Sequence, residues 1–219
     1  MRRIGLLVLA AGLAAGCSGA RSGHATVWVT RDRGATVLHT AGVPAGLTAM
    51  QALERVAKVQ TSYGGRYVRS VDGVAEHGRR SWFYYVNGYL ADRGAAEYRL
   101  RDGDVEWWDY RAWRDPSQDG VVVGAFPEPF LHGYNGTRPP AVVISAEPAA
   151  GRMLARLLHG RWLSPATPPP PNANVLVVHS GRTRFAAALV GPAVRMTFSG
   201  DWHLLLRGRY PFRFRYSVG

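Results

Sequence analysis

Alternating apolar and polar positions divide the first half of the chain into short predicted strands. Two segments rich in β-branched and aromatic side chains, residues 26–30 and 35–40, flank a turn at Arg33-Gly34, and this pattern predicts a β-hairpin. Three later segments have the same character, and each is bounded by Gly, Asp or Asn: residues 66–71, 81–86 and 104–110. Strands are therefore expected to dominate this half.

One helix is predicted between the hairpin and the later strands, over residues 49–58. Its apolar residues recur at helical spacing and share one face: Met50, Leu53, Val56 and Ala57. Thr48 and Gln51 have the spacing of a capping box, which satisfies free amides at a helix start. A hairpin, one helix and further short strands is the order of a β-grasp-like domain. We therefore expect an α+β fold in which residues 25–114 form strands around one helix.

The second half, residues 120–219, has a less regular pattern that predicts a smaller α+β domain packed on the first. A helical pattern covers residues 148–159, and a run of prolines predicts an extended surface linker over residues 164–174. The segments expected to be strands are residues 120–124, 141–144, 175–178, 185–190, 194–198 and 212–216.

The N-terminus has the pattern of an export signal. Arg2 and Arg3 precede an apolar run over residues 4–15, which is too short for a bilayer core that needs about 20 residues. The run ends in Leu-Ala-Ala-Gly directly before Cys17, the one cysteine of the chain. This motif resembles the lipobox of bacterial lipoproteins.

The lipobox resemblance implies that residues 1–16 are a signal peptide and that Cys17 carries a diacylglycerol lipid, with palmitate among its acyl chains. Residues 17–24 are then a lipidated tether, and two acyl chains give durable anchoring. The mature protein is expected to be extracytoplasmic and anchored to the cell membrane by its lipid. A plain secretory signal with a chance cysteine nearby is the alternative.

The formal charge of +12 comes almost entirely from arginine, because Lys58 is the one lysine among 219 residues. A basic chain is expected to have an anionic neighbour such as nucleic acid, phosphate or a membrane surface. Codon bias in a GC-rich genome produces the same arginine excess and is the alternative. Export makes nucleic acid in the cytoplasm an unsuitable partner.

Several short motifs of the first half occur in the order and spacing of a known family. They are Tyr67 to Gly73, Trp82 to Gly88, Gly94-Ala95, Leu100 to Asp104 and Trp107 to Tyr110. In these motifs the first half resembles the bacterial DUF4430 family, which is similar to the C-terminal β-domain of the vitamin B12 carriers transcobalamin and intrinsic factor. The resemblance implies a transcobalamin-like domain with a corrinoid such as cobalamin as the first candidate ligand. The helical domain that supplies much of the carriers' cobalamin site has no counterpart in this sequence.

The predicted strand over residues 81–86 has aromatic side chains on both faces, with Trp82 and Tyr84 on the same one. Tyrosine and tryptophan join a large apolar surface to a polar tip, which suits them to hold a flat ligand. The family resemblance implies that the ligand faces this hairpin, so Trp82, Tyr84, Asn87 and Tyr89 are the predicted ligand contacts. A role in the core and in a domain interface is the alternative for the aromatics. Asn87-Gly88 also has the pattern of a type I′ turn.

The residues typical of catalysis and metal binding are scattered. The seven histidines include no pair four residues apart, and a single cysteine cannot form a cysteine cluster, so no metal site is expected. A Gly-x-Ser-x-Gly elbow and a phosphate loop are both missing from the sequence. Ser199, Asp201 and His203 have residue types that a hydrolase uses, so a cell-wall enzyme is a third possibility. Residues 132–136 are predicted to be an exposed loop, where binding residues concentrate.

Together these patterns predict a non-enzymatic lipoprotein, without a cofactor, that captures a small ligand at the outer face of the cytoplasmic membrane. Its expected partners are the membrane through the lipid anchor, a small molecule such as cobalamin or another corrinoid, and an uptake permease that receives it, with no nucleic acid among them. The alternative is a structural or protein-interaction surface lipoprotein with no small-molecule ligand.

Overall fold

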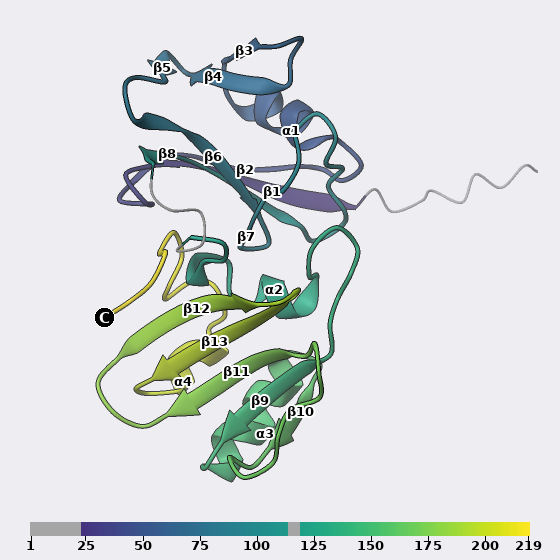
Figure 1. Cartoon of the computed structure of the whole chain (residues 1–219), viewed down its shortest axis with the longest axis vertical. Coiled ribbons are helices and arrows are strands. Elements are labelled where there is room, and N and C mark those ends of the chain that lie inside the picture. The colour runs from purple at the N-terminus through teal and green to yellow at the C-terminus, as the bar shows by residue number, and fades with distance from the viewer. Residues whose placement is uncertain (1–22, 114–118) are drawn as a thin grey trace, which may run out of the picture.

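The computed structural model describes residues 23–113 and 119–219 of the chain. Its two main sheets lie one above the other, and each packs against a helix on one face (Figure 1). Cys17, the predicted signal peptide and most of the predicted tether lie outside the described residues, as does the predicted boundary after residue 114. Within the described residues, no helix has both the length and the apolar character needed to cross a membrane.

The first sheet contains five strands in the order β2-β1-β8-β6-β7. Their bounds are β1 His24–Arg31, β2 Thr36–Pro44, β6 Arg80–Val86, β7 Tyr89–Leu90 and β8 Val105–Ala112. β1 and β8 run parallel at the centre, and β2 and β6 pair antiparallel with them. The predicted hairpin and the predicted strands over residues 81–86 and 104–110 are confirmed.

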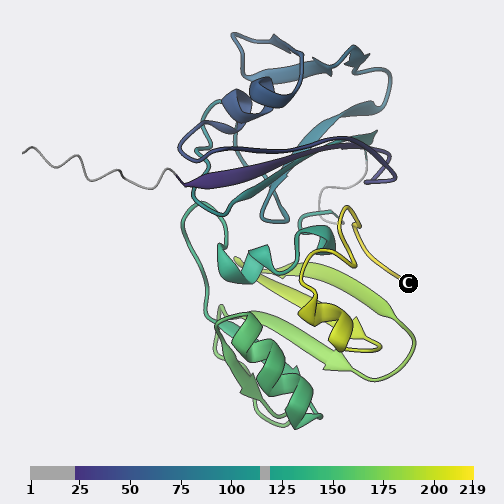
Figure 2. The ribbon, with the colours of Figure 1, turned by 180° about the vertical axis from the view of Figure 1, so that it is seen from behind.

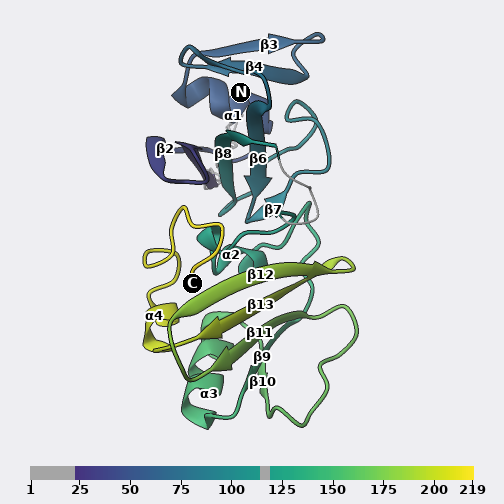
Figure 3. The same cartoon turned by 60° about the vertical axis from the view of Figure 1, so that its left-hand side comes forward.

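Helix α1 (Ala49–Val56) follows the hairpin and packs across β1 and β2. The Thr48 hydroxyl accepts a hydrogen bond from the Gln51 amide at 3.2 Å, and Gln51 Oε1 accepts one from the Thr48 amide at 2.9 Å. This is the predicted capping box, which satisfies two amides that have no partner within the helix. Beyond the helix lies a three-stranded sheet of β3 (Val59–Ser62), β4 (Tyr67–Val71) and β5 (Val74–Ala75) (Figure 3).

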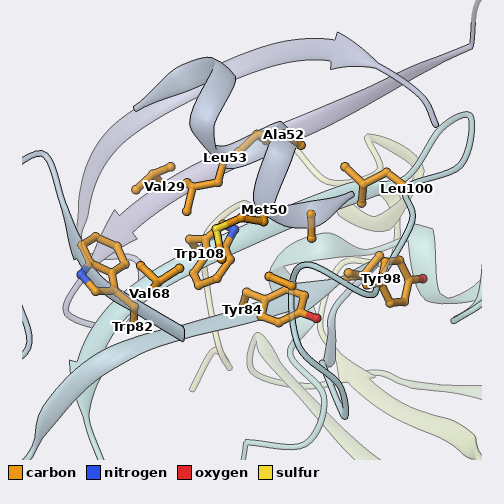
Figure 4. Packing of buried hydrophobic residues seen from close by; sticks show 14 of the residues in the cluster. Val29, Met50, Ala52, Leu53, Val68, Trp82, Tyr84, Tyr98, Leu100 and Trp108 are labelled. Atoms are coloured by element: carbon orange, nitrogen blue, oxygen red, sulfur yellow. The ribbon is translucent and has the colours of Figure 1, made fainter. Parts of the chain in front are cut away.

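The core of the first domain fills the space between α1, the small sheet and the inner face of the first sheet (Figure 4). Leu53 of the helix lies against Val29 of β1, and Met50 lies over the indole of Trp108 on β8. Each of these apolar side chains is buried, and complete burial of a residue of this size stabilises the fold by about 1.5–3 kcal/mol. The helical spacing of the sequence therefore identifies the face that builds this core.

The second sheet contains five strands in the order β10-β9-β11-β13-β12. Their bounds are β9 Ala141–Ser145, β10 Arg161–Leu163, β11 Asn174–His179, β12 Arg184–Val190 and β13 Ala193–Ser199. β10, β9, β11 and β13 are parallel to one another, and β12 adds antiparallel at one edge. The predicted Pro-rich linker leads from β10 to β11 without a helix or strand of its own between residues 164 and 173.

Helices α3 (Pro148–Leu157) and α4 (His203–Leu206) cover the same face of the second sheet (Figure 2). Leu154 and Leu158 pack with Leu176 of β11 and Met196 of β13 in a separate buried core. The turn η2 (Val123–Ala125) and helix α2 (Glu128–Leu131) lie between the two sheets (Figure 1). The prediction of an α+β class is confirmed, and the β-grasp assignment stays a prediction.

Two of the strand predictions for the second half, over residues 120–124 and 212–216, are wrong. Residues 120–124 lead into the 3₁₀ turn η2, and residues 212–216 form turns in which Phe214 has φ +62°, outside the strand region. Val122, Phe214 and Tyr216 pack with Trp28 and Trp107 of the first sheet, whereas Val121, Val123 and Phe212 pack in the core of the second domain. The ring centroid of Phe214 lies 4.9 Å from that of Trp28, and the centroid of Tyr216 lies 5.3 Å from that of Trp107. These apolar runs are thus buried partly against the first domain and partly in the second core, and they do not form strands.

A buried polar network accompanies this contact between the domains. Tyr216 donates its hydroxyl proton to Asp109 Oδ2 at 2.9 Å and accepts a hydrogen bond from Arg111 Nε at 3.0 Å. Arg111 also lies 3.4 Å from Asp119, and Arg33 donates to the same carboxylate at 2.9 Å. The first domain therefore depends on the C-terminal segment for both apolar and polar contacts.

Candidate interdomain ligand site

The hairpin turn between β6 and β7 places the candidate site at the junction of the domains. Asn87 and Gly88 have φ of +51° and +86°, the two left-handed conformations that a type I′ turn requires. A side chain at Gly88 would meet the Val122 carbonyl oxygen at 2.9 Å, so the turn also lies tightly against the second domain. This contact directs β7 toward the second domain.

A cavity of about 690 Å³ opens beside β7, with walls from both domains. The first domain contributes Tyr89, Asp92 and Arg93, and the second contributes Tyr134, Arg138 and Leu189. A volume of this size lies within the range of about 300–1,000 Å³ in which proteins hold small organic molecules. The cavity is thus large enough for a ligand and depends on both domains for its shape.

Three tyrosines form a row beside this cavity, and two of them, Tyr89 and Tyr134, line it. The ring centroid of Tyr134 lies 5.4 Å from that of Tyr89 and 5.3 Å from that of Tyr98, with interplanar angles of 33° and 36°. Tyr89 and Tyr98 are buried, and Tyr134 between them is half-buried and lines the cavity. Burial raises the pKa of Tyr98 to about 12 and raises that of Tyr134 further, so these hydroxyls stay protonated at neutral pH. The wall is neutral and aromatic.

Charged groups gather at the rim of the cavity. The Asp92 carboxylate accepts hydrogen bonds from Arg93 Nε at 3.0 Å and from the Tyr134 hydroxyl at 2.6 Å. These bonds, that of Arg93 first, hold the pKa of Asp92 below its ordinary value. The amide of Asn135 lies within 3.2 Å of both terminal nitrogens of Arg93 when its oxygen faces them. Arg138 also lines the cavity; its side chain is exposed, and its Nη1 donates to the Leu131 carbonyl at 3.4 Å.

A smaller cavity of about 330 Å³ lies on the other side of the segment after β7. Trp82, Tyr84 and Trp108 line it, and Leu90 and Arg93 line both cavities. The Tyr84 ring stacks on Trp108 with centroids 4.8 Å apart, and its hydroxyl donates to the Arg93 carbonyl at 2.6 Å. Trp82 Nε1 donates to the Val74 carbonyl at 2.9 Å. Both predicted contacts are buried, and their polar tips already have partners within the protein.

The four predicted ligand contacts therefore have different surroundings. Tyr89 lines the large cavity, while Trp82 and Tyr84 line the small one and belong to the first core. Asn87 is 1% exposed and lines neither cavity. Its Nδ2 donates to Asp104 at 2.7 Å and to the Gly133 carbonyl at 3.0 Å, and its Oδ1 accepts from the Val105 amide at 2.8 Å. Asn87 therefore has a structural role, because its side chain bonds the hairpin turn to Asp104, Val105 and Gly133.

Sequence reasoning did not find three charged residues of the large cavity, namely Asp92, Arg93 and Arg138. Isolated charges in loops have no periodicity, and arginine is common throughout this chain. The loop over residues 132–136 did carry a signal, because it was predicted to be exposed and it supplies Tyr134. Only the fold shows that this loop faces the β6–β7 hairpin.

The residue types considered for metal binding and hydrolysis do not assemble at this cavity. Among residues 23–113 and 119–219, no group of three or more His, Cys, Asp or Glu side chains is placed to hold a metal ion. Asp201 and His203 form a pair at 2.7 Å in the second domain, and the Ser199 hydroxyl donates to the Arg182 carbonyl at 2.7 Å. Ser199 thus directs its proton to the backbone.

Part of the first domain matches a known family model. Residues 46–112 match the model of a family described as a domain of unknown function, DUF4430. No curated protein matches the chain. The crystal structure of haptocorrin in complex with Cbi is similar over 42% of this chain and 26% of the haptocorrin chain, at 15% identity and a TM-score of 0.35.

A second solved structure is similar over the same share of this chain. It is a protein from Ruminococcus gnavus named as a candidate metal-binding protein, with 99% of its own chain covered, 15% identity and a TM-score of 0.32. The family match falls on the segment whose motifs resemble DUF4430 in the sequence, from the end of the hairpin to the end of β8. Residues 46–112 of this chain therefore match the DUF4430 family model, which covers less than half of the chain.

Proposed function

We propose that this protein is an exported, lipid-anchored binding protein that captures a small molecule in the cavity between its two domains. The observation that carries the proposal is the cavity of about 690 Å³ with an aromatic wall and a charged rim. Ligand sites in proteins have this composition, a largely apolar surface with a few convergent polar groups that orient the ligand. The walls come from both domains, so a bound ligand stabilises their packing as well.

The side chains at this cavity fit a flat, partly apolar molecule that carries amide or acid groups. Tyr89 and Tyr134 offer aromatic surface, and Arg93 and Arg138 offer guanidinium donors for oxygen acceptors. A corrinoid has this chemistry and is the ligand to test first, because the motifs of the first domain resemble the β-domain of the vitamin B12 carriers. Only part of such a ring would be covered, so we expect micromolar affinity, about −8 kcal/mol.

Export and anchoring belong to the same proposal. The apolar run before Cys17 and the small residues beside it support a lipid on that cysteine. A protein held at the outer face of the membrane would pass its ligand to an uptake permease, without catalysis. Labelling of cells with a fatty-acid probe tests the anchor, since Cys17→Ser should lose the label and leave the membrane fraction. Unchanged labelling of Cys17→Ser contradicts it.

Binding is tested by calorimetric titration of the unlipidated Cys17→Ser protein with cobinamide and cobalamin. We expect saturable binding that falls at least tenfold in Tyr134→Ala and in Arg138→Ala. Tyr63→Ala and Arg195→Ala are matched controls, because both residues are exposed and lie outside the cavity. No saturable heat with either compound at about 1 mM overturns the corrinoid proposal.

A second candidate function is a structural or protein-interaction lipoprotein without a small-molecule ligand. The observation that favours it is the burial of Trp82 and Tyr84, which pack on Tyr110 and Trp108 with satisfied polar tips. If the protein has this second function, Tyr134→Ala and Arg138→Ala leave every small-molecule titration unchanged. They then alter only the capture of a protein partner.

A further inference from the structure

The second sheet has a feature separate from the interdomain cavity, at the carboxyl ends of its parallel strands. The chain leaves β9 through α3 to β10 on one side, then returns to β11 on the other side of β9. The connections after β9 and β11 therefore diverge at this point. In open sheets of parallel strands, ligands bind in the crevice that such a divergence leaves outside the carboxyl ends.

A crevice of about 520 Å³ lies at this edge of the sheet. It is lined by residues that follow three parallel strands: Glu147 after β9, His179 and Ser180 at the end of β11, and Trp202 after β13. Ser145, the last residue of β9, also lines it. Segments distant in sequence thus converge on one opening in a domain that has no part in the family match.

Hydrogen bonds between the three loops fix the shape of the crevice. Trp202 Nε1 donates to Glu147 Oε1 at 3.1 Å, which joins the loop after β13 to the loop after β9. The Gly200 amide donates to the His179 carbonyl at 3.1 Å and joins the loop after β13 to the end of β11. The opening is therefore organised before any ligand binds, which lowers the entropic cost of binding.

Several polar groups in the crevice keep unused hydrogen-bonding capacity. Ser145 is 2% exposed, and its Oγ accepts from the Glu147 amide at 3.1 Å. Among the described residues, the Ser145 hydroxyl has no acceptor for its own proton, and Glu147 Oε2 has no donor. His179 and Ser180 are exposed at the opposite side. The half-buried Trp202 ring, stacked on the adjacent His203 at 3.8 Å, adds aromatic surface.

The charge of the lining restricts the class of ligand. Glu147 is the one acidic residue of the lining, although the chain as a whole carries a formal charge of +12. No arginine or lysine lines the crevice, and Glu147, the residue before α3, adds a carboxylate that repels an anion. An anionic ligand is therefore disfavoured.

We propose that this crevice is a second ligand site that binds a ring of a neutral saccharide. Vicinal hydroxyls of a sugar donate to a carboxylate and accept from a hydroxyl, which matches Glu147 and Ser145. The weakly polar C–H face of the same ring packs on an aromatic surface such as Trp202. This inference does not depend on the interdomain site, because the two cavities share no lining residue.

The test is titration of the Cys17→Ser protein with glucose, N-acetylglucosamine and maltotriose. Binding is measured by calorimetry and by the NMR shift of the Trp202 indole N–H resonance. We expect at least one of these sugars to shift that resonance saturably, with a Kd of about 0.1–10 mM for a shallow site. Glu147→Gln and Trp202→Ala should each weaken the calorimetric binding at least tenfold. Glu54→Gln and Trp113→Ala are matched controls, since both residues are exposed and lie outside the crevice.

Trp202→Phe keeps an aromatic ring and serves as a control for misfolding of Trp202→Ala. It should retain part of the sugar affinity at an unchanged melting temperature. The proposal is overturned if none of the three sugars moves the Trp202 resonance at about 50 mM. It is also overturned if sulfate or choline moves it and the sugars do not. Loss of corrinoid binding in Tyr134→Ala leaves these titrations unchanged, so failure at one site is distinguishable from failure at the other.

Discussion

Tyr134 donates its phenolic proton to Asp92 Oδ1 over 2.6 Å and accepts a hydrogen bond from the Asp92 amide at 3.1 Å. These bonds join the loop before the second sheet to the segment that follows β7 in the first sheet. The same two residues line the interdomain cavity. One side-chain contact thus holds the two domains at the place where their walls meet.

Replacement of Tyr134 by Phe should remove this link and keep the aromatic wall. The pKa of Asp92 is low because Arg93 and then Tyr134 donate to its carboxylate, so the variant should raise this pKa part of the way toward its ordinary value. A carboxyl group with a lowered pKa stabilises the folded state at pH values above its unfolded pKa. That contribution to the free energy of unfolding is lost as the pH falls through the folded pKa. An NMR titration of the Asp92 carboxyl carbon measures the change. An unaltered pKa contradicts the assigned role.

Glu106 predicts an unusual dependence of stability on pH. Its carboxyl is fully buried, one oxygen accepts from Trp108 Nε1, and the other has no partner among residues 23–113 and 119–219. Burial raises its pKa well above the ordinary value. A raised pKa means that the stabilising contribution is present at acidic pH and is lost as pH rises through the folded pKa. Glu106→Gln, which keeps an acceptor for Trp108, should therefore stabilise the protein more at pH 8 than at pH 5. Urea unfolding of the variant and the parent protein at both pH values measures this difference in the free energy of unfolding. A larger stabilisation at pH 5 than at pH 8 would contradict a raised pKa of Glu106.

The C-terminal segment is expected to matter for stability beyond its length. Tyr216→Phe removes a hydroxyl that serves both Asp109 and Arg111, and leaves these buried groups short of a partner. The cost should be about 1–3 kcal/mol in the free energy of unfolding. Tyr210→Phe is the matched control, because that side chain is 77% exposed. Equal unfolding free energies for the two variants would show that the network is not needed.

Asn87 distinguishes a ligand contact from a structural residue. Asn87→Ala loses three hydrogen bonds of a buried side-chain amide. It also places alanine at φ +51°, a left-handed conformation that alanine adopts less readily than asparagine. We expect a loss of about 2–4 kcal/mol in stability. Any fall in ligand affinity should disappear when the folded fraction is taken into account. A stable variant with weakened binding would restore the ligand role predicted from the sequence.

Local patterns of the sequence account for much of the fold. The capping box at Thr48 and Gln51 and the apolar helical face locate α1, and the Asn87-Gly88 pair locates the hairpin turn. Residues 212–216 could not be assigned in this way, because Phe214 and Tyr216 are aromatic for contact with the first domain and not for strand pairing. The interdomain cavity combines Tyr89 with Tyr134 across 45 positions, which no local period encodes.

The most direct test of the central claim is a crystal structure of the Cys17→Ser protein grown with cobinamide at about ten times its calorimetric Kd, or at about 1 mM if no heat is measured. We predict a corrin ring in the cavity between the domains, in contact with Tyr134 and with Arg93 or Arg138. A structure in which this cavity holds no cobinamide, or in which the ring is bound elsewhere on the protein, would contradict it.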